Sequence, residues 1–405
     1  MIYILSHSPS GCGKAIFEVF ILKKIISKIL SYVLVAVIAS GTTVACFFFA
    51  QKNNSTKLKE VENIISQYFI GDVDMGKLED AAASAMVSAL GDRWSYYMTA
   101  EQYQSYQQTM SNSYVGIGIT ILVRQDGTGF DITEVVDGGP AQQSGVLAGD
   151  ILTAVDGTNV AGMDTASLSP LVRGEENTNV KLTILRNGET KEFTITRKKF
   201  QTPVATYQML PDNIGLITIE NFDQRCADET IAAIEALTAQ GAEALIFDVR
   251  NNPGGFKTEM LKVLDYLLPE GPLFRAVDYR GKETVDYSDA KHLEIPMAVV
   301  MNLSSYSAAE FFAAALDEYD AAVTVGEKTF GKGHFQNAIP LSDGSAINLS
   351  VGKYTTPKGV SLTGVGLQPE VEVTVDETTA AKILAGTLAP EEDSQILAAI
   401  NALKD

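Results

Sequence analysis

The sequence predicts a multidomain protein of mixed α+β and α/β class with an N-terminal transmembrane helix. Three observations support this prediction. An uncharged run covers residues 29–50, short alternating strands begin at Tyr114, and strands alternate with longer helices from residue 213 onwards. At 405 residues the chain is also too long for one ordinary hydrophobic core, so we expect two or three domains.

The composition limits the classes of binding site. The formal net charge of −19 argues against a nucleic-acid partner, because phosphate contacts need clustered Lys and Arg. The cysteines, Cys12, Cys46 and Cys226, are too scattered for a disulfide framework or a CxxC metal site. The chain holds only three histidines, so we expect no metal site and no cofactor.

The run at 29–50 is long enough to cross a bilayer core, which needs about 20 apolar residues. Lys23, Lys24 and Lys28 precede it and favour a cytoplasmic N-terminus. A cleaved signal peptide is the alternative, although the apolar run is long for one. With an uncleaved anchor, the chain is a single-pass protein of the cell membrane whose remaining residues lie outside the cytoplasm.

Residues 51–111 are predicted to be helical. The stretch "KLKEVENIISQYFI" places apolar residues along one helical stripe, at Leu58, Val61, Ile64, Ile65 and Tyr68. Further along, "GDRWSYY" holds the only tryptophan of the chain. We expect this aromatic cluster to anchor the segment to another domain.

Residues 112–198 predict a small β domain, because short alternating segments are separated by Gly, Asp and Asn turns. Gly116 and Gly118 leave backbone N–H groups open to a peptide carboxylate, and the strand that follows offers an edge for an added strand. A purely structural glycine turn is the alternative. Together with "GPAQQSGVLAGDILTAVDG", this stretch resembles a PDZ domain. The expected peptide-binding residues are Tyr114, Val115, Gly116, Ile117, Gly118 and Ile119.

The remaining chain alternates strands and helices, which predicts an α/β layer domain. In "NLSSYSAAEFF", Ser307 follows a strand and opens a helix, so the N–H of Ala308 and the helix N-terminus could stabilise an oxyanion. The same residues form the pattern S-x-x-E of a capping box, which needs no catalysis. In "DVRNNPGG", two glycines after a buried strand free the backbone to point N–H groups into a crevice.

Lys332, in "KTFGKGHFQ", could hold a phosphate or take a proton. The phosphate interpretation fails because Gly333 and His334 follow the lysine and no helix begins there. As a base for Ser307, the lysine needs its pKa, ordinarily about 10.4, lowered by about 3 units through burial. Its two flanking glycines allow close packing over the amine. His334 is the rival base, but no carboxylate that would orient it is recognisable.

These motifs, in this order, resemble the carboxyl-terminal processing peptidases, or tail-specific proteases. The resemblance covers about 60–390 and includes "VGEKTFGKGHFQ", "LSDGSAINLSVGKYTTPKG" and "GVGLQPEVEV". It implies a PDZ domain followed by a serine–lysine protease domain with a crotonase-like αβ core. Together with the uncharged run and the helical pattern, it divides the chain into a cytoplasmic segment 1–28, a transmembrane anchor 29–50, a helical region 51–111, a PDZ domain 112–198, a protease domain 199–375 and a C-terminal helical segment 376–405.

The resemblance also assigns roles to residues. It implies that Ser307 is the nucleophile, Lys332 the general base and Gln336 the residue that orients the lysine ammonium. The oxyanion hole is expected from the N–H of Ala308 and that of Gly254 or Gly255, and Arg173 is expected to couple the PDZ domain to the protease. Two departures from the family pattern are Ala309, in place of a flanking serine, and "DRWSYY", in place of "D-P-H-S-x-Y".

The sequence therefore predicts a membrane-anchored extracytoplasmic serine endopeptidase that captures the C-terminal tails of proteins, needs no metal or nucleotide, and takes part in proteolysis and signal transduction. One alternative is a PDZ peptide-binding scaffold with an inactive protease domain. Another is an acyl-CoA enzyme on a crotonase-like core, against which the PDZ domain and the anchor argue. The oligomeric state stays open, with a homo-oligomer as one option.

Overall fold

The computed structural model describes residues 57–404, which fall into two compact units that divide after Ala83. The expected cytoplasmic segment 1–28 and transmembrane anchor 29–50 lie outside the described residues. Between Lys57 and Lys404, no helix is both long enough and apolar enough to span a membrane.

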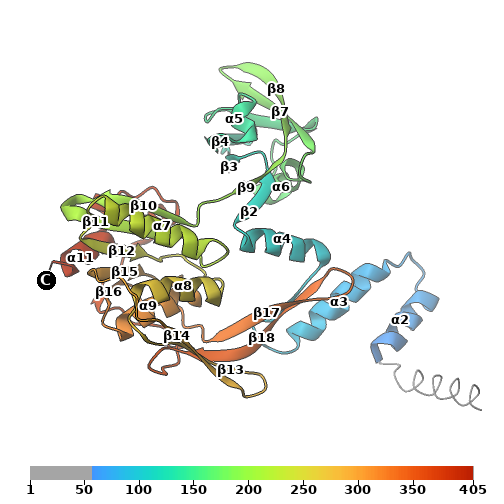
Figure 1. Ribbon diagram of the computed structural model, residues 1–405. Helices are drawn as coiled ribbons and strands as arrows, with labels where there is room; N and C mark the ends of the chain where they lie inside the picture. The colour runs from blue at the N-terminus through green and yellow to red at the C-terminus, as the bar shows by residue number, and fades with distance from the viewer. Residues whose placement is uncertain (1–56, 405) are drawn as a thin grey trace, which may run out of the picture. The chain divides into compact units, whose positions relative to one another are not determined.

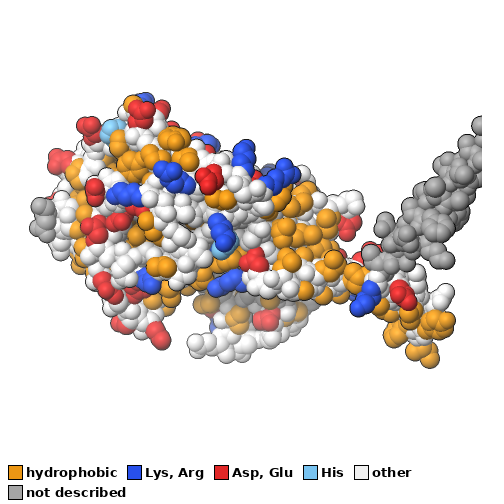
Figure 2. Space-filling view, turned by 90° about the horizontal axis from the view of Figure 1, so that it is seen from below, with side chains coloured by type: hydrophobic (Ala, Val, Ile, Leu, Met, Phe, Trp, Pro, Cys, Tyr) orange, Lys and Arg blue, Asp and Glu red, His pale blue; other side chains and the backbone are white. Residues whose placement is uncertain are grey.

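The first unit contains α2 (Lys57–Tyr68) and the beginning of α3 (Met75–Ser88). Its predicted helical character is confirmed by α2, although no residue of that helix is buried. The apolar stripe includes the exposed side chains of Leu58, Val61 and Ile64. Apolar side chains are visible on the segment next to the grey trace (Figure 2).

The second unit begins with the end of α3 and continues through β1 (Tyr96–Met98) and α4 (Ala100–Met110). A capping box between Thr99 and Gln102 starts α4. Strand β1 pairs antiparallel with β18 (Ala346–Thr355), so a segment from early in the chain joins a sheet formed by its last third. The indole of Trp94 packs against Phe330, with ring centroids 5.7 Å apart, and so the expected aromatic anchor is confirmed.

Residues 113–201 form a β module. Its stem consists of β2 (Ser113–Gly116) and β9 (Lys198–Gln201), which pair antiparallel. Its sheet has the order β3-β4-β5-β7-β8, with β6 paired to β5, so β3 is an edge strand. The elements are β3 (Ile119–Val123), β4 (Phe130–Val135), α5 (Pro140–Gln143), β5 (Ile151–Val155), β6 (Thr158–Asn159), α6 (Thr165–Val172), β7 (Asn179–Arg186) and β8 (Glu189–Thr196). Inward-facing side chains such as Phe130, Leu152 and Leu182 fill its core.

The predicted α/β layer is a six-stranded main sheet with the order β10-β11-β12-β15-β16-β19 (Figure 1). All neighbouring strands are parallel except β10 and β11. The strands are β10 (Ala205–Leu210), β11 (Ile214–Ile219), β12 (Ala244–Asp248), β15 (Met297–Met301), β16 (Ala322–Gly326) and β19 (Val371–Glu372), with the turn η1 (Pro211–Asn213) between the first two. Every residue of β12 and β15 is buried, as expected for strands covered on both faces.

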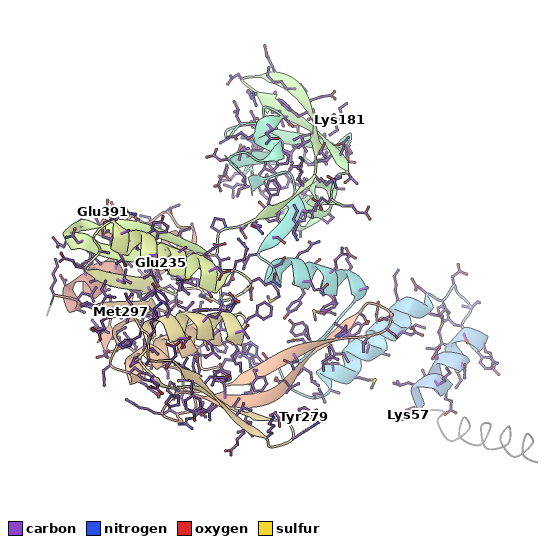
Figure 3. The ribbon with its side chains drawn as sticks, in the orientation of Figure 1. Lys57, Lys181, Glu235, Tyr279, Met297 and Glu391 are labelled. Carbon is purple, nitrogen blue, oxygen red and sulfur yellow. The ribbon has the colours of Figure 1, made fainter. Side chains whose placement is uncertain are left out.

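Helices cover both faces of the main sheet. Alternate side chains of β12 and β15 pack in one cluster with α7 (Cys226–Ala239), α8 (Lys257–Leu267) and α9 (Ala308–Glu318). The intervening side chains pack against α11 (Ser394–Ala402). Met297, at the start of β15, belongs to the first cluster (Figure 3). The short elements α10 (Glu377–Leu384) and η2 (Pro390–Glu392) precede α11.

A second, antiparallel sheet completes this part of the chain. Its longest strand, β18, pairs with β1, with β17 (His334–Pro340) and with β13 (Gly271–Asp278), which in turn pairs with β14 (Glu283–Ser288). Because β17 begins two residues after Lys332, the pairing of β17 with β18 fixes one end of the loop that carries this lysine.

Candidate active site

Ser307 lies between β15 and α9 in a backbone conformation that serine rarely adopts, with φ of 60° and ψ of −120°. The turn before it is held by Ser305, whose buried Oγ donates to the carbonyl of Val249 at 2.7 Å. Ser307 lines a cavity of about 820 Å³. Strained backbone of this kind clusters at functional sites, so the conformation favours a role beyond helix capping.

The loop that follows β12, which contains "DVRNNPGG", lies against the Ser307 turn. The backbone N–H of Asn251 donates to Oδ1 of Asn302 at 3.0 Å, and the amide of Asn302 donates back to Oδ1 of Asn251 at 3.0 Å. This proximity follows from the sheet, because β12 and β15 are parallel neighbours and their carboxyl ends meet at one edge. A Cβ at Gly254 would lie 2.8 Å from Cβ of Ser307, so only glycine fits there.

The backbone N–H groups beside Ser307 distinguish between the two candidate glycines. The N–H of Gly254 donates to Oδ1 of Asn252 at 2.9 Å and is therefore occupied. Among the hydrogen bonds of residues 57–404, the N–H groups of Gly255 and Ala308 have no acceptor. Gly255, rather than Gly254, is thus the glycine whose N–H is available to a ligand beside Ala308.

Lys332 lines the same cavity and is packed tightly by its two glycine neighbours. A Cβ at Gly331 would lie 2.9 Å from the nitrogen of Gly366, and one at Gly333 would lie 2.0 Å from Oγ1 of Thr363. This burial lowers the pKa of Lys332 to about 8, against the opposing effect of nearby carboxylates. The close packing predicted for the glycines is therefore present.

The amine of Lys332 lies over the indole of Trp94, with Nζ 4.2 Å from the ring centroid. In the described part of the chain, no hydrogen bond joins this Nζ to Oγ of Ser307. The side-chain amide of Gln336 donates to the carbonyl of His334 at 3.1 Å and to Oγ of Ser350 at 3.0 Å, and not to the lysine. The structure therefore brings Ser307, Lys332 and Gln336 to one cavity without joining their functional atoms.

Glu310 connects the serine turn to the lysine loop, and sequence reasoning assigned it only a capping role. It is fully buried, and its Oε1 accepts hydrogen bonds from the backbone N–H of Ser307 at 2.9 Å and of Lys332 at 2.6 Å. Its Oε2 accepts from the N–H of Gly331 at 2.8 Å and from Oγ1 of Thr329 at 3.0 Å. Burial raises the pKa of Glu310, although these four donors pull it down. The capping-box spacing was its only signal in the sequence.

Two further residues bear on the lysine. The buried hydroxyl of Tyr354 donates to the carbonyl of Lys332, and sequence reasoning gave no signal for this contact. Burial raises the pKa of Tyr354 above its ordinary value, so the phenol stays protonated and remains a donor. His334, the rival base, is the first residue of β17 and is absent from the side chains that line the cavity.

In the β module, the predicted peptide-binding residues span the end of β2 and the start of β3. Gly118 has a φ of +77°, and its carbonyl accepts from the N–H of Val136 at 3.0 Å. Ile117 is buried in the module core. Among the described strands, β3 pairs only with β4 and leaves its other edge unpaired. Arg173 is exposed at the C-cap of α6. The module therefore has the open strand edge that peptide augmentation requires.

Within residues 57–404, no three His, Cys, Asp or Glu side chains gather as metal ligands. Comparison with known families gives two matches. Residues 213–373 match Peptidase family S41, and residues 132–186 match the PDZ domain. The first match includes the turn of Ser307 and the loop of Lys332.

Individual relatives give the same result. A protein named "Probable CtpA-like serine protease" from Staphylococcus aureus (strain COL) is 31% identical over 362 residues, covering 85% of this chain and 72% of the relative. A relative with the same name from Staphylococcus haemolyticus (strain JCSC1435) is 31% identical over 353 residues, covering 84% of this chain and 71% of the relative. The crystal structure titled "Putative S41 protease" from Bacteroides fragilis NCTC 9343 has a TM-score of 0.51 at 17% identity, covering 81% of this chain and 97% of that one, and supports the fold. The chain belongs to peptidase family S41 and is a C-terminal processing serine peptidase with a PDZ domain.

Proposed function

We propose that this peptidase is a membrane-anchored endopeptidase in which Ser307 is the nucleophile and Lys332 the general base. The observation that carries this assignment is that both residues line one cavity and donate backbone hydrogen bonds to the same oxygen of Glu310. The lowered pKa of Lys332 supports it, because only the neutral amine can accept a proton.

In the acylation step, the neutral amine of Lys332 takes the proton of the Ser307 hydroxyl while Oγ attacks the carbonyl carbon of the scissile bond. The negative charge that develops on the carbonyl oxygen is stabilised by the N–H groups of Ala308 and Gly255. The C–N bond then breaks, and the Lys332 ammonium gives its proton to the leaving amine. This leaves an acyl-enzyme on Ser307.

In the deacylation step, Lys332 takes a proton from water, and the resulting hydroxide attacks the acyl carbon. The ester bond breaks, Ser307 Oγ recovers its proton from Lys332, and the new carboxylic acid loses its proton to solvent and leaves as a carboxylate. The position of Nζ over Trp94 suits the protonated resting base, since an aromatic face attracts a cation. We assign Gln336 to orienting the amine once it turns toward Ser307.

The PDZ domain would capture the C-terminal tail of a substrate. The unpaired edge of β3 can add the tail as a strand, and the N–H groups near Gly118 can hold its carboxylate. Arg173, at the end of α6, is the proposed link from peptide occupancy to the protease. Attachment to the cell membrane, with the protease outside the cytoplasm, rests on the uncharged run 29–50.

The test uses the full-length chain in detergent micelles and fluorogenic peptides that end in apolar tails. Ser307→Ala and Lys332→Met are expected to lower kcat/KM by at least about 1,000-fold, whereas Ser304→Ala, at an exposed neighbour, keeps wild-type activity. Equal cleavage by Ser307→Ala and wild type would overturn the choice of nucleophile. A wild-type chain that binds tails and never cleaves them would favour the inactive scaffold.

A further inference from the structure

Asp223 carries a buried carboxyl group, one oxygen of which lacks a hydrogen-bond partner among residues 57–404. It lies between β11 and α7, is only 4% exposed, and lines the same cavity as Ser307. Its Oδ1 makes no hydrogen bond with any described residue. A buried polar atom left unpaired costs about 1–3 kcal/mol, so folds rarely keep one without a use. The mechanism above does not use this carboxyl group.

The backbone around Asp223 is held firmly. The preceding residue, Phe222, bridges the glycine loop: its N–H donates to the carbonyl of Gly254 at 2.7 Å, and its carbonyl accepts from Phe256 at 2.7 Å. The N–H of Asp223 donates to Oδ1 of Asn221 at 2.9 Å. Asp223 therefore follows directly on the segment that supports Gly255, close to the proposed oxyanion hole.

The walls of the cavity near Asp223 are largely apolar and aromatic. Tyr106 and Met110, both on α4, line the same cavity. Burial raises the pKa of Tyr106 to about 12, and the charge of nearby Asp223 adds to this rise. Met110 is connected to the loop through its carbonyl, which accepts from the N–H of Gln224 at 3.1 Å. These side chains offer an aliphatic and aromatic surface beside a single carboxylate.

No cation of the described chain neutralises Asp223, although it is the only Asp or Glu that lines the cavity. Lys257 pairs with Asp286 at 2.9 Å, and Arg93 lies over aromatic rings. Lys332 lies over an indole ring. The cations that share the cavity are thus engaged elsewhere.

The protonation of Asp223 is sensitive to a ligand. Burial raises its pKa to about 7, and the titratable groups that feel its charge are Tyr106 on α4 and Cys226 at the start of α7. An approaching cation favours the ionised carboxylate and lowers this pKa. The group can therefore become charged when a basic ligand binds.

We propose that Asp223 forms a specificity subsite for a basic side chain, Lys or Arg, of the peptide substrate. The aliphatic stem of that side chain packs against Met110 and Tyr106, and its charged end pairs with the free Oδ1. This inference rests on the proposed function, because it needs a peptide in the cavity of Ser307. The alternative that the test distinguishes is that Oδ1 accepts a hydrogen bond from a main-chain N–H of the substrate.

The test compares peptides that differ at one position, Lys, Arg or the uncharged norleucine, with that position scanned across the cleavage site. The enzymes are the full-length wild type, Asp223→Asn and the control Asp228→Asn, which removes a charge from the exposed face of α7. At one position the wild type is expected to prefer Lys or Arg over norleucine by about 10- to 100-fold in kcat/KM. Asp223→Asn brings that ratio close to 1, mainly through KM, and Asp228→Asn keeps it.

A second measurement does not depend on the variant folding. In the wild type, the preference for Lys over norleucine is expected to grow as the pH rises through about 7, because the carboxyl group ionises. A preference absent at every position, or unchanged in Asp223→Asn, overturns the proposal. An equal loss on all peptides in that variant assigns Oδ1 to a main-chain N–H instead.

The Ser307→Ala variant separates this proposal from the proposed function. If the wild type cleaves, Ser307→Ala does not, and no basic preference exists, only the Asp223 subsite is wrong. If Ser307→Ala cleaves as the wild type does, the proposed nucleophile is wrong whatever the preference.

Discussion

Oε1 of Glu310 accepts a hydrogen bond of 2.6 Å from the backbone N–H of Lys332. The same oxygen accepts the N–H of Ser307 at 2.9 Å, so one buried carboxylate joins the serine turn to the lysine loop. Glu310 lies in the first turn of α9, three residues after Ser307, and a change at its side chain therefore displaces both proposed reacting groups together.

Replacement of Glu310 by Gln tests this connection. The side-chain NH₂ of glutamine would face groups that now donate to the Glu310 carboxylate, so at least one buried N–H would lose its acceptor. We therefore expect the free energy of unfolding to fall by about 1–3 kcal/mol. The displacement should also lower kcat by about 100-fold. Urea unfolding and peptide cleavage measure the two effects. Glu235→Gln, at an exposed position of α7, is the matched control (Figure 3). Wild-type stability and activity in Glu310→Gln would contradict the role.

The pKa of Lys332 predicts the pH dependence of cleavage. Burial lowers this pKa to about 8, and the base works only when neutral, so kcat/KM should rise with pH and level off above a midpoint near 8. The measurement is kcat/KM for an uncharged reference peptide between about pH 6 and pH 10. This range covers about two pH units on either side of the midpoint. An acid-shifted midpoint near 6.5, the ordinary pKa of histidine, would favour His334 as the base.

The indole of Trp94 should set part of that midpoint. It stabilises the Lys332 ammonium by about 0.5–2 kcal/mol, so Trp94→Leu is expected to lower the midpoint by about 0.4–1.5 pH units. Trp94→Phe keeps an aromatic face and should shift the midpoint less. Both variants lose packing against Phe330, and the comparison therefore depends on the pH profile and not on the rate at one pH. If the pH midpoint of cleavage were the same in both variants as in the wild type, the contact between Lys332 and the Trp94 indole would be ruled out in the working enzyme.

Gly254 and Gly241 form a matched pair for testing the glycine loop. Their φ values are +93° and +95°, so alanine is strained by about the same amount at either site, on the order of 1 kcal/mol. At Gly254 the new Cβ would also lie 2.8 Å from Cβ of Ser307, whereas at Gly241 it meets nothing within 4 Å. Gly254→Ala should lower kcat by about 100-fold, and Gly241→Ala should not change it. Similar activity in the two variants would argue against this contact.

The position of the serine turn follows from local pattern. The segments "ALIFDVR" and "MAVVMN" are continuous apolar runs, which predict buried strands, and neighbouring parallel strands end at the same edge of a sheet. The glycines of "DVRNNPGG" and Ser307 follow those strands, so their meeting was predictable from the sequence and the resemblance together. The close packing of the Lys332 loop was predictable in the same way, from glycine on both sides.

The remaining contacts of the site depend on long-range geometry. Glu310 satisfies a local capping pattern, and its bonds to Thr329 and Gly331 appear only once a loop about 20 residues later folds over it. The unpaired state of Asp223 depends on which side chains surround it, and sequence spacing does not show this. The choice of Gly255 over Gly254 depends on one hydrogen bond from the backbone to Asn252.

The stem of the PDZ domain has a consequence for how the chain is assembled. Strands β2 and β9 lie side by side, and the N–H of Thr202 donates to the carbonyl of Asn112 at 3.0 Å, so the polypeptide leaves and re-enters the neighbouring fold at nearly one point. The domain is thus an insertion whose ends already meet. The domain could therefore be replaced by another module whose two ends lie equally close together. The order of all the other segments along the chain would not change.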